Sequence, residues 1–312
     1  MRLEEKNFAD SFGINLKELP DECSEIIKNT DFTYHVLEGV EKDNAILDEL
    51  KRIECDTQVI ADPSRTEVWE KGWNENLVAF RESGWDLETL IPKFYRKDIP
   101  LRLNQQFIKS QNERFEYDFF RVFRMWIFKT YFKDVKNIYE FGCGTGYNLV
   151  ELAEIYPDKN IVGLDFVPSV IELLTEIHTH KKKNISGILF DMIHPDFSVN
   201  IEPDSAIYTF GAIEQLGGQI HKLFDFFLKK NPQICVHMEP MAELYDDNNL
   251  IDFLAKKFHK KRGYTEGLLS LLKQLQEEKR AEILKVKRLY LGNYNMEGYN
   301  LVIWKPRDNN GR

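Results

Sequence analysis

The chain has 312 residues, 43% of them hydrophobic, and a formal net charge of −9 at pH 7. This length can bury a substantial core and exceeds the length of one nucleotide-binding domain. The acidic balance argues against a nucleic-acid partner, because phosphates are normally neutralised by a basic surface. The sequence has neither an apolar stretch of membrane-spanning length nor the apolar region of a signal peptide. We therefore expect a cytoplasmic protein without a membrane partner.

Residues 1–102 are charged and show helical periodicity interrupted by turns. We predict that they form a helical N-terminal extension that acts as a lid. Trp69, Trp73 and Trp85 lie close together within it. Such a cluster either packs the extension onto its parent domain or forms an aromatic wall for a substrate, and the sequence leaves both interpretations open.

A long helical pattern follows between Leu103 and Phe132, with phenylalanine and isoleucine on one face. We predict one helix over this range that leads into the first strand of a core domain. Tyr117 and Arg121 on this helix are then either residues at the edge of the core or substrate-binding residues.

The segment from 137 to 149 predicts a buried strand that ends in an acid, a glycine-rich turn and the start of a helix. Gly142, Gly144 and Gly146 allow positive φ values and a close backbone approach, and the helix presents unpaired N–H groups over the turn. The turn is not a dinucleotide-binding fingerprint, because Tyr147 occupies the position of the third glycine. It is nevertheless suited to a small polar cofactor.

Three more apolar runs follow at the spacing of strand–helix units: 160–165, which ends in Asp165; 185–191, which ends in Asp191; and 205–210. An acid at the end of the second strand can accept hydrogen bonds from ribose hydroxyls. The alternation predicts a parallel sheet whose ligands lie beyond the carboxyl ends of the strands.

The glycine pattern and the acids after it resemble those of the class I methyltransferases that depend on S-adenosylmethionine (SAM). The resemblance implies an α/β fold with a Rossmann-like, seven-stranded methyltransferase sheet and an antiparallel last strand. Residues 233–240 are the predicted fifth strand, and a hairpin of 283–291 with 299–304 matches the pair that closes the family's sheet. Residues 241–282 are predicted to be a helical insertion between strands 5 and 6, in a SAM-binding core that spans 103–312.

The resemblance implies SAM as cofactor and assigns residues to it. Glu140 and the glycines should surround the methionine part, Asp165 should bind the ribose, and Asp191 with the backbone at Met192 should contact the adenine. Each acid could instead cap a helix or lie on the surface. The predicted cofactor-binding residues are Glu140, Gly142, Cys143, Gly144, Gly146, Asp165, Phe166, Asp191, Met192 and Glu214.

His237 and Glu239 are the predicted catalytic residues. They lie two residues apart at the end of the fifth strand, so their side chains point the same way. A histidine oriented by a carboxylate could be the general base for a hydroxyl acceptor. The alternative is a histidine in the core beside a glutamate that caps a helix. No metal is predicted, because the residues flanking the fourth strand lack the ligand set of catechol-type methyltransferases.

The insertion contributes polar and aromatic residues that could orient a sugar or another polyol. They could also belong to a solvated helical face, or the basic ones could contact a phosphate or carboxylate. The predicted substrate-binding residues are Tyr117, Arg121, Tyr245, His259, Arg262 and Tyr264.

We therefore predict a SAM-dependent methyltransferase that acts on a small polar metabolite, by O-methylation of a sugar or other hydroxylated acceptor. The alternative is N-methylation of an amino sugar or other small amine. An alternative of another class is a non-catalytic SAM-binding regulatory or partner subunit, because Gln215 stands where many members carry histidine. The sequence leaves the formation of a homodimer open.

Overall fold

The computed structural model describes residues 1–58, 60, 65–93, 95 and 99–307. Within them, seven strands form a large sheet in the order β6-β5-β4-β7-β8-β11-β9. These strands are β4 (Asn137–Phe141), β5 (Asn160–Asp165), β6 (Ile185–Leu189), β7 (Ser205–Phe210), β8 (Ile234–Glu239), β9 (Ala281–Lys287) and β11 (Asn300–Pro306). Strands β4 to β8 pair in parallel, whereas β11 is antiparallel to both β8 and β9. The predicted α/β sheet with an antiparallel last strand is confirmed.

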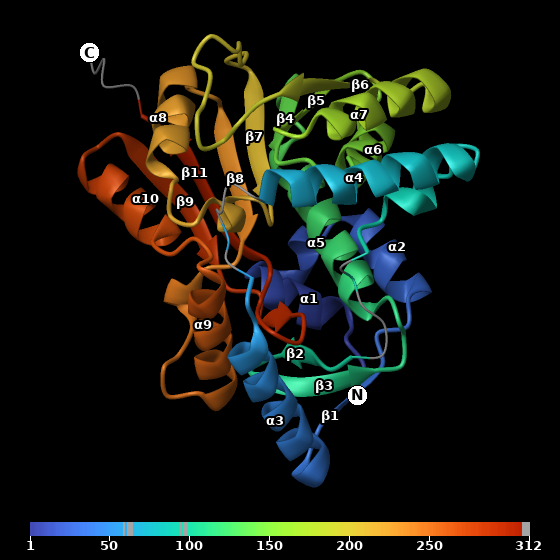
Figure 1. The fold of residues 1–312 in the computed structure, drawn as a ribbon, viewed down its shortest axis with the longest axis vertical. Coiled ribbons are helices and arrows are strands. Elements are labelled where there is room, and N and C mark those ends of the chain that lie inside the picture. Colours follow the sequence, from blue (N-terminus) through green and yellow to red (C-terminus); the bar gives the residue numbers. More distant parts are fainter. Residues whose placement is uncertain (59, 61–64, 94, 96–98, 308–312) are drawn as a thin grey trace.

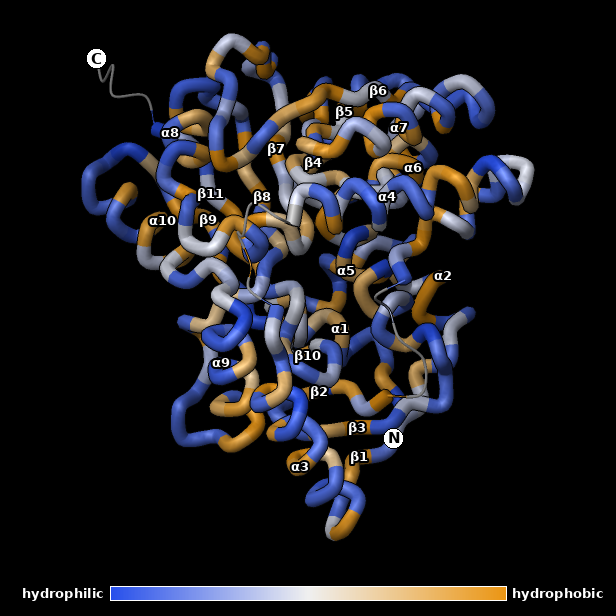
Figure 2. Tube along the Cα trace, viewed as in Figure 1, coloured by the Kyte–Doolittle hydropathy of each residue, from blue (hydrophilic) through white to orange (hydrophobic). Residues whose placement is uncertain are grey.

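Helices cover both faces of the large sheet (Figure 1). On one face lie α5 (Phe115–Tyr131), α6 (Tyr147–Ile155) and α7 (Pro168–Lys181), and on the other lie α8 (His221–Lys230) and α10 (Leu268–Glu277). Strand alternation divides the core: Ile138 of β4 packs with the first group of helices, whereas Tyr139 and Phe141 pack with the second. Figure 2 shows a hydrophilic turn after α10.

The predicted helix over 103–132 is wrong in its first part, because α5 begins at Phe115. A hairpin of β2 (Leu101–Leu103) and β3 (Gln106–Ser110) precedes it. Asn104 and Gln105 form its turn with φ values of 49° and 61°, the left-handed region that two-residue hairpin turns require. The hairpin belongs to a small sheet in the order β1-β3-β2-β10, which the sequence did not predict. Its outer strands are β1 (Tyr34–Val36) and β10 (Leu291–Gly292).

The N-terminal extension packs directly on the core. Its helices are α1 (Glu5–Phe12), α2 (Asp21–Asn29), α3 (Gly39–Cys55) and α4 (Arg65–Glu82). Phe12 of α1 stacks on Trp126 of α5 with ring centroids 4.9 Å apart, so the extension enlarges the core. The predicted boundary after residue 102 falls inside the β2–β3 hairpin. The division into a lid and a core domain stays a prediction.

Helix α4 lies beside α7 near the carboxyl ends of the parallel strands (Figure 1). Arg81 at its end pairs with Glu172 and Glu176 of α7, and Trp85 stacks on His180 with centroids 3.8 Å apart. These contacts fix α4 over the edge of the sheet where the predicted cofactor residues lie.

The predicted helical insertion between β8 and β9 is present and consists of α9 (Leu250–Arg262) and α10. Short 3₁₀ helices complete the secondary structure: η1 (Leu16–Glu18), η2 (Leu87–Leu90), η3 (Ile213–Leu216) and η4 (Ala242–Leu244). Among the described residues, none of the helices combines the length and the apolar character that a membrane crossing requires.

Candidate active site

The turn between β4 and α6 depends on its glycines. Gly142, Gly144 and Gly146 have φ values of +72°, +50° and +72°. A Cβ on Gly142 would lie 2.5 Å from the Cβ of Ala212, and one on Gly146 would lie 2.5 Å from a methyl group of Leu174. Side chains at these positions would therefore be strained and would clash. Gly146 begins α6 and packs against α7, so its role is structural.

Glu140 is buried beneath this turn. Its Oε1 accepts a hydrogen bond from Asn148 Nδ2 at 2.7 Å, and its Oε2 accepts one from Tyr208 Oη at 2.8 Å. Burial raises the pKa of Glu140 to about 8 although these donors oppose the shift. Both carboxyl oxygens thus already have protein partners, and they tie β4 to the first turn of α6.

Asp165 at the end of β5 also contacts the turn. Its Oδ2 accepts a hydrogen bond from the Gly144 N–H at 3.0 Å, and its Oδ1 accepts one from the Val167 N–H at 3.1 Å. Burial raises the pKa of Asp165 to about 6, and these backbone donors oppose the shift. Each oxygen keeps a lone pair for a further donor, so the carboxylate can still accept hydrogen bonds from a ligand.

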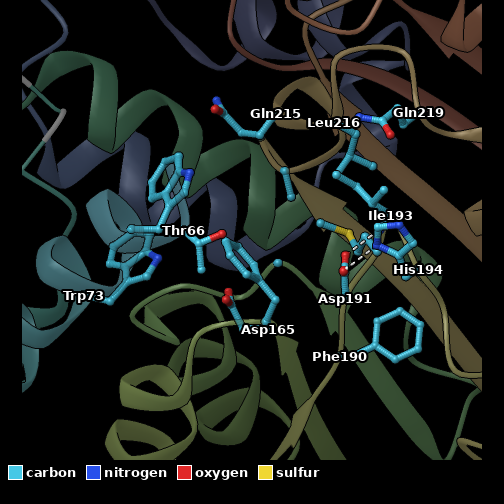
Figure 3. Close-up of a pocket in the computed structure, with 16 residues that line it drawn as sticks. Thr66, Trp73, Asp165, Phe190, Asp191, Ile193, His194, Gln215, Leu216 and Gln219 are labelled. Carbon is cyan, nitrogen blue, oxygen red and sulfur yellow. Dashed lines mark hydrogen bonds and ion pairs between the residues drawn. The ribbon is translucent and has the colours of Figure 1, made fainter. Parts of the chain in front are cut away.

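A first cavity of about 350 Å³ opens in front of Asp165 (Figure 3). The predicted residues Phe166, Asp191 and Met192 line it together with Asp165 and Gly142. Asp191 accepts hydrogen bonds from the Ile193 N–H at 2.8 Å and from His194 Nδ1 at 2.9 Å. Thr66 and Trp73 of α4 lie on the opposite side of Asp165 from Asp191 in Figure 3. The cavity therefore lies between the extension and the strand ends.

A second cavity of about 350 Å³ lies on the other side of the glycine turn. It is lined by the predicted cofactor residues Glu140, Gly142, Cys143, Gly144 and Glu214. The first and second cavities adjoin, because they share five lining residues: Trp69, Trp73, Gly142, Gly211 and Gln215.

These cavities fit SAM. Gly142 of the turn borders both cavities, and Asp165 presents a carboxylate with unused lone pairs. Asp165, Phe166, Asp191 and Met192 would hold the adenosine part, and residues 140–144 would hold the methionine part. When bound, SAM supplies a methyl group made electrophilic by its sulfonium.

His237 and Glu239 do not line either cavity. The alternation of β8 directs both toward α8, where the His237 ring lies 5.7 Å from that of Phe227. Its Nδ1 lies 3.0 Å from Thr209 Oγ1, and burial lowers its pKa to about 3. Glu239 accepts hydrogen bonds from the N–H groups of Ala212 and Glu214, at the start of η3. The structure thus matches the alternative of a core histidine beside a capping glutamate, and His237 is not placed as a general base.

Some of the predicted substrate-binding residues do reach a cavity. Arg262 and Tyr264 line the second cavity, and Arg262 Nε pairs with Asp56. Tyr117 lines an outer cavity of about 300 Å³, which shares Pro92 and Glu116 with the second cavity.

The remaining predicted substrate-binding residues line none of these three cavities. Arg121 is half exposed, with its Nε 3.9 Å from a Glu151 oxygen. Tyr245 is buried, and its hydroxyl accepts a hydrogen bond from the Glu297 N–H. His259 is buried, with its Nε2 2.9 Å from the Thr265 carbonyl oxygen. Tyr245 and His259 thus make hydrogen bonds that hold the insertion in place, whereas Arg121 faces Glu151 of α6.

The sequence-based prediction missed Glu116, whose side chain lines the second cavity from the first turn of α5. Helical spacing places it on the same face as Phe119, Phe120 and Phe123. A carboxylate on an apolar helix face is a recognisable signal. Tyr117 and Arg121, which were predicted on this helix, do not line the second cavity.

No metal centre emerges: the described part of the chain has no group of three or more histidine, cysteine, aspartate and glutamate side chains placed to hold an ion.

Comparison with known proteins gives one family match. Residues 132–196, from the end of α5 to the segment after β6, match the family model described as a methyltransferase domain. No curated protein sequence matches the chain at a significant level.

Solved structures that resemble this chain have low sequence identity to it, and two of them are methyltransferases. The plantazolicin methyltransferase BpumL in complex with S-adenosylhomocysteine (SAH) is 14% identical, with 59% of this chain and 80% of that chain covered and a TM-score of 0.40. The methyltransferase domain of bacterial CtHen1-C is 15% identical, with 57% and 92% covered and a TM-score of 0.42. At these scores the two structures carry no argument about this chain, and the family match covers only residues 132–196.

Proposed function

We propose that the chain is a class I SAM-dependent methyltransferase whose acceptor, a small polar metabolite, binds in the second cavity beside the methionine part of SAM. The observation that carries the proposal is the continuity of the two cavities across Gly142 and Gly211. A methyltransferase must hold donor and acceptor in line and remove a proton where the acceptor requires it. A volume of about 350 Å³ lies in the range of small-molecule sites.

The residues that the N-terminal extension contributes to the cavities support the proposal of a small acceptor. Trp69 and Trp73 of α4 line both cavities, and Tyr264 and Arg262 from the insertion line the second cavity. The second cavity is therefore lined by segments that are far apart in the sequence. Such an arrangement is expected for a site that binds a metabolite and not for a groove that binds a polymer. In this proposal, α4 and the insertion together form the predicted lid.

The acceptor atom is an oxygen or a nitrogen. The hydroxyl acceptor predicted from the sequence requires a base, and His237 lies away from the cavity. Glu116 and Glu214 line the cavity, and burial raises the pKa of each to about 8. A carboxyl group with such a pKa can take up a proton near neutral pH. An amine acceptor is the second candidate, and the acidic lining of the cavity favours it.

The test uses SAM labelled in its methyl group and a cell extract separated into low-mass, protein and nucleic-acid fractions. The proposal expects label in the low-mass fraction, and less of it with the variant Trp73→Ala. Trp85→Ala is the matched control, because Trp85 stacks on His180 and lines neither cavity. Label confined to protein or nucleic acid would contradict the proposal.

A further inference from the structure

We propose that the acceptor binds as a protonated amine, and that Glu116 holds its ammonium group and receives its proton. This inference rests on the proposed function and narrows it to N-methylation. It starts from the buried Glu116 carboxyl group, which lines the second cavity and has no hydrogen-bond or ion-pair partner among the described residues.

Glu116 is only 7% exposed and lines both the second cavity and the outer cavity. Among the described residues, no hydrogen bond or ion pair engages its carboxyl group. A buried carboxyl without a partner is costly, because desolvation is not compensated. That cost would be offset by a ligand that brings a positive charge and N–H donors to the same place.

Glu214 adds a second carboxyl group to the same cavity. Glu214 lies on η3, whereas Glu116 lies on α5, so the two carboxyl groups come from different walls of the cavity. The Oε1 of Glu214 accepts a hydrogen bond from Gln215 Nε2 at 2.7 Å. The charges of Glu116 and Glu214 both contribute to the raised pKa of Tyr299. The two carboxyl groups therefore lie near the same phenol, which also lines the cavity.

Positive charge is scarce in the described lining of the second cavity. Arg262 is the one lysine, arginine or histidine among the lining residues of the second cavity, and it pairs with Asp56. Arg124 lies behind the wall, with its guanidinium 4.9 Å from the centre of the Tyr147 ring, and it pairs with Glu151 at 3.0 Å. The described lining of the cavity thus carries more carboxyl groups than basic groups.

Aromatic side chains form much of the remaining wall. They are Trp69, Trp73, Tyr147, Phe210, Tyr264 and Tyr299. Tyr299 stacks on Phe210 with ring centroids 3.9 Å apart. Aromatic faces attract cations, most strongly in sites shielded from water. Carboxyl groups within an aromatic enclosure suit an amine better than a neutral sugar hydroxyl.

The proposed step is a proton transfer followed by methyl transfer. The ammonium N–H donates to the Glu116 carboxylate, and its proton moves to a Glu116 oxygen, so that the nitrogen regains its lone pair. The nitrogen then forms a bond to the methyl carbon while the carbon–sulfur bond breaks and its electron pair stays on sulfur. The products are SAH and the N-methylated ammonium, and Glu116 later releases its proton to water.

The experiment titrates SAH-loaded protein calorimetrically with small amines, each paired with the alcohol of the same skeleton, such as glucosamine with glucose and ethanolamine with ethylene glycol. We expect the amines to bind about tenfold or more tightly than their alcohols, as for a charge-assisted hydrogen bond. Glu116→Gln should abolish this preference while SAH affinity stays unchanged. Asp118→Asn is the matched control on the same helix turn, because Asp118 bonds to Asn112 and lines none of the three cavities.

A second readout separates ligand contact from a structural role. Burial raises the pKa of Glu116 to about 8, so amine binding near pH 7 should release a proton. The binding enthalpy should then depend on the ionisation enthalpy of the buffer, and this dependence should vanish in Glu116→Gln.

Three results would overturn the inference: alcohols that bind as tightly as amines, an unchanged preference in Glu116→Gln, or no amine binding by protein that binds SAH. Failure of SAH itself to bind would instead contradict the proposed function.

Discussion

Trp73 lies directly against Gly144: a Cβ on this glycine would come within 3.0 Å of the Trp73 ring. The contact joins α4 of the extension to the glycine turn of the core. Thr145, the next residue, donates a hydrogen bond from Oγ1 to the Leu90 carbonyl oxygen at 2.6 Å, a second link to the extension. The N-terminal extension therefore contacts the glycine turn of the candidate site through α4 and η2.

This contact predicts that Trp73→Ala weakens SAH binding by about 1–2 kcal/mol, because a large aromatic wall shared by both cavities is lost. Calorimetric titration of the purified variant measures the change. Trp85→Ala should leave the affinity unchanged, since that ring stacks on His180 outside the cavities. Equal effects of the two substitutions would indicate a general loss of packing.

Asp165 provides the second prediction. Asp165→Ala should weaken SAM binding by about 1–3 kcal/mol, as expected for the loss of charge-assisted hydrogen bonds. The variant also removes the acceptor for the Gly144 N–H, so circular dichroism must first establish that it is folded. Asp165→Asn keeps the shape of the side chain and should show a smaller loss. Unchanged affinity in a folded Asp165→Ala would disprove the ribose assignment.

His237 should matter for stability and not for chemistry. His237→Ala should lower the free energy of unfolding by about 2–4 kcal/mol, because it leaves a cavity among Phe224, Phe227 and Trp304. The rate per folded molecule should change little. A selective fall of the rate by roughly 10² or more in a stably folded variant would restore its role as general base.

The pKa of His237 also predicts a pH effect. Burial lowers this pKa from its ordinary value of 6.5 to about 3, so the fold favours the neutral ring. Its contribution to stability is complete above pH 6.5 and is lost as the pH falls toward 3. Denaturant unfolding of wild type and His237→Phe across this range measures the contribution, which the variant should lack.

The raised pKa of Glu116 predicts that stability depends on pH in the opposite direction. Burial raises its pKa from 4.5 to about 8, so the fold favours the protonated form. Its contribution to stability is complete below pH 4.5 and is lost as the pH rises toward 8. Glu116→Gln should therefore be more stable than wild type by roughly 2–5 kcal/mol at pH 8 and nearly equal to it at pH 4. Chemical denaturation of wild type and Glu116→Gln at both pH values tests this prediction. Equal stabilities of the two proteins at pH 8 would show that Glu116 is not buried as described.

The core fold was predictable because its signals are local and repeated. Each parallel strand is a short apolar run. Glu140 near the end of β4, Asp165 at the end of β5 and Asp191 just after β6 therefore lie at one edge of the sheet. The glycine turn was equally clear, since positive φ at Gly142 and Gly144 leaves little choice of residue.

The small sheet and the residues that line the second cavity were less predictable from the sequence. Strands β1, β2 and β10 have three residues or fewer and pair across distant parts of the chain, so periodicity does not reveal them. The sequence did not place His237 correctly, because strand alternation shows that His237 and Glu239 point the same way but does not show which face of the sheet they occupy. Glu116 carried a visible signal on its apolar helix face, whereas the closeness of Trp73 to Gly144 arises only from tertiary packing.

The most direct test of the central claim is a calorimetric titration of the purified protein with SAM and, separately, with NADH. The glycine turn with Asp165 and Asp191 at the strand ends predicts micromolar binding of SAM and no binding of NADH. A folded protein that does not bind SAM, or that binds NADH in its place, would contradict the assignment as a SAM-dependent methyltransferase.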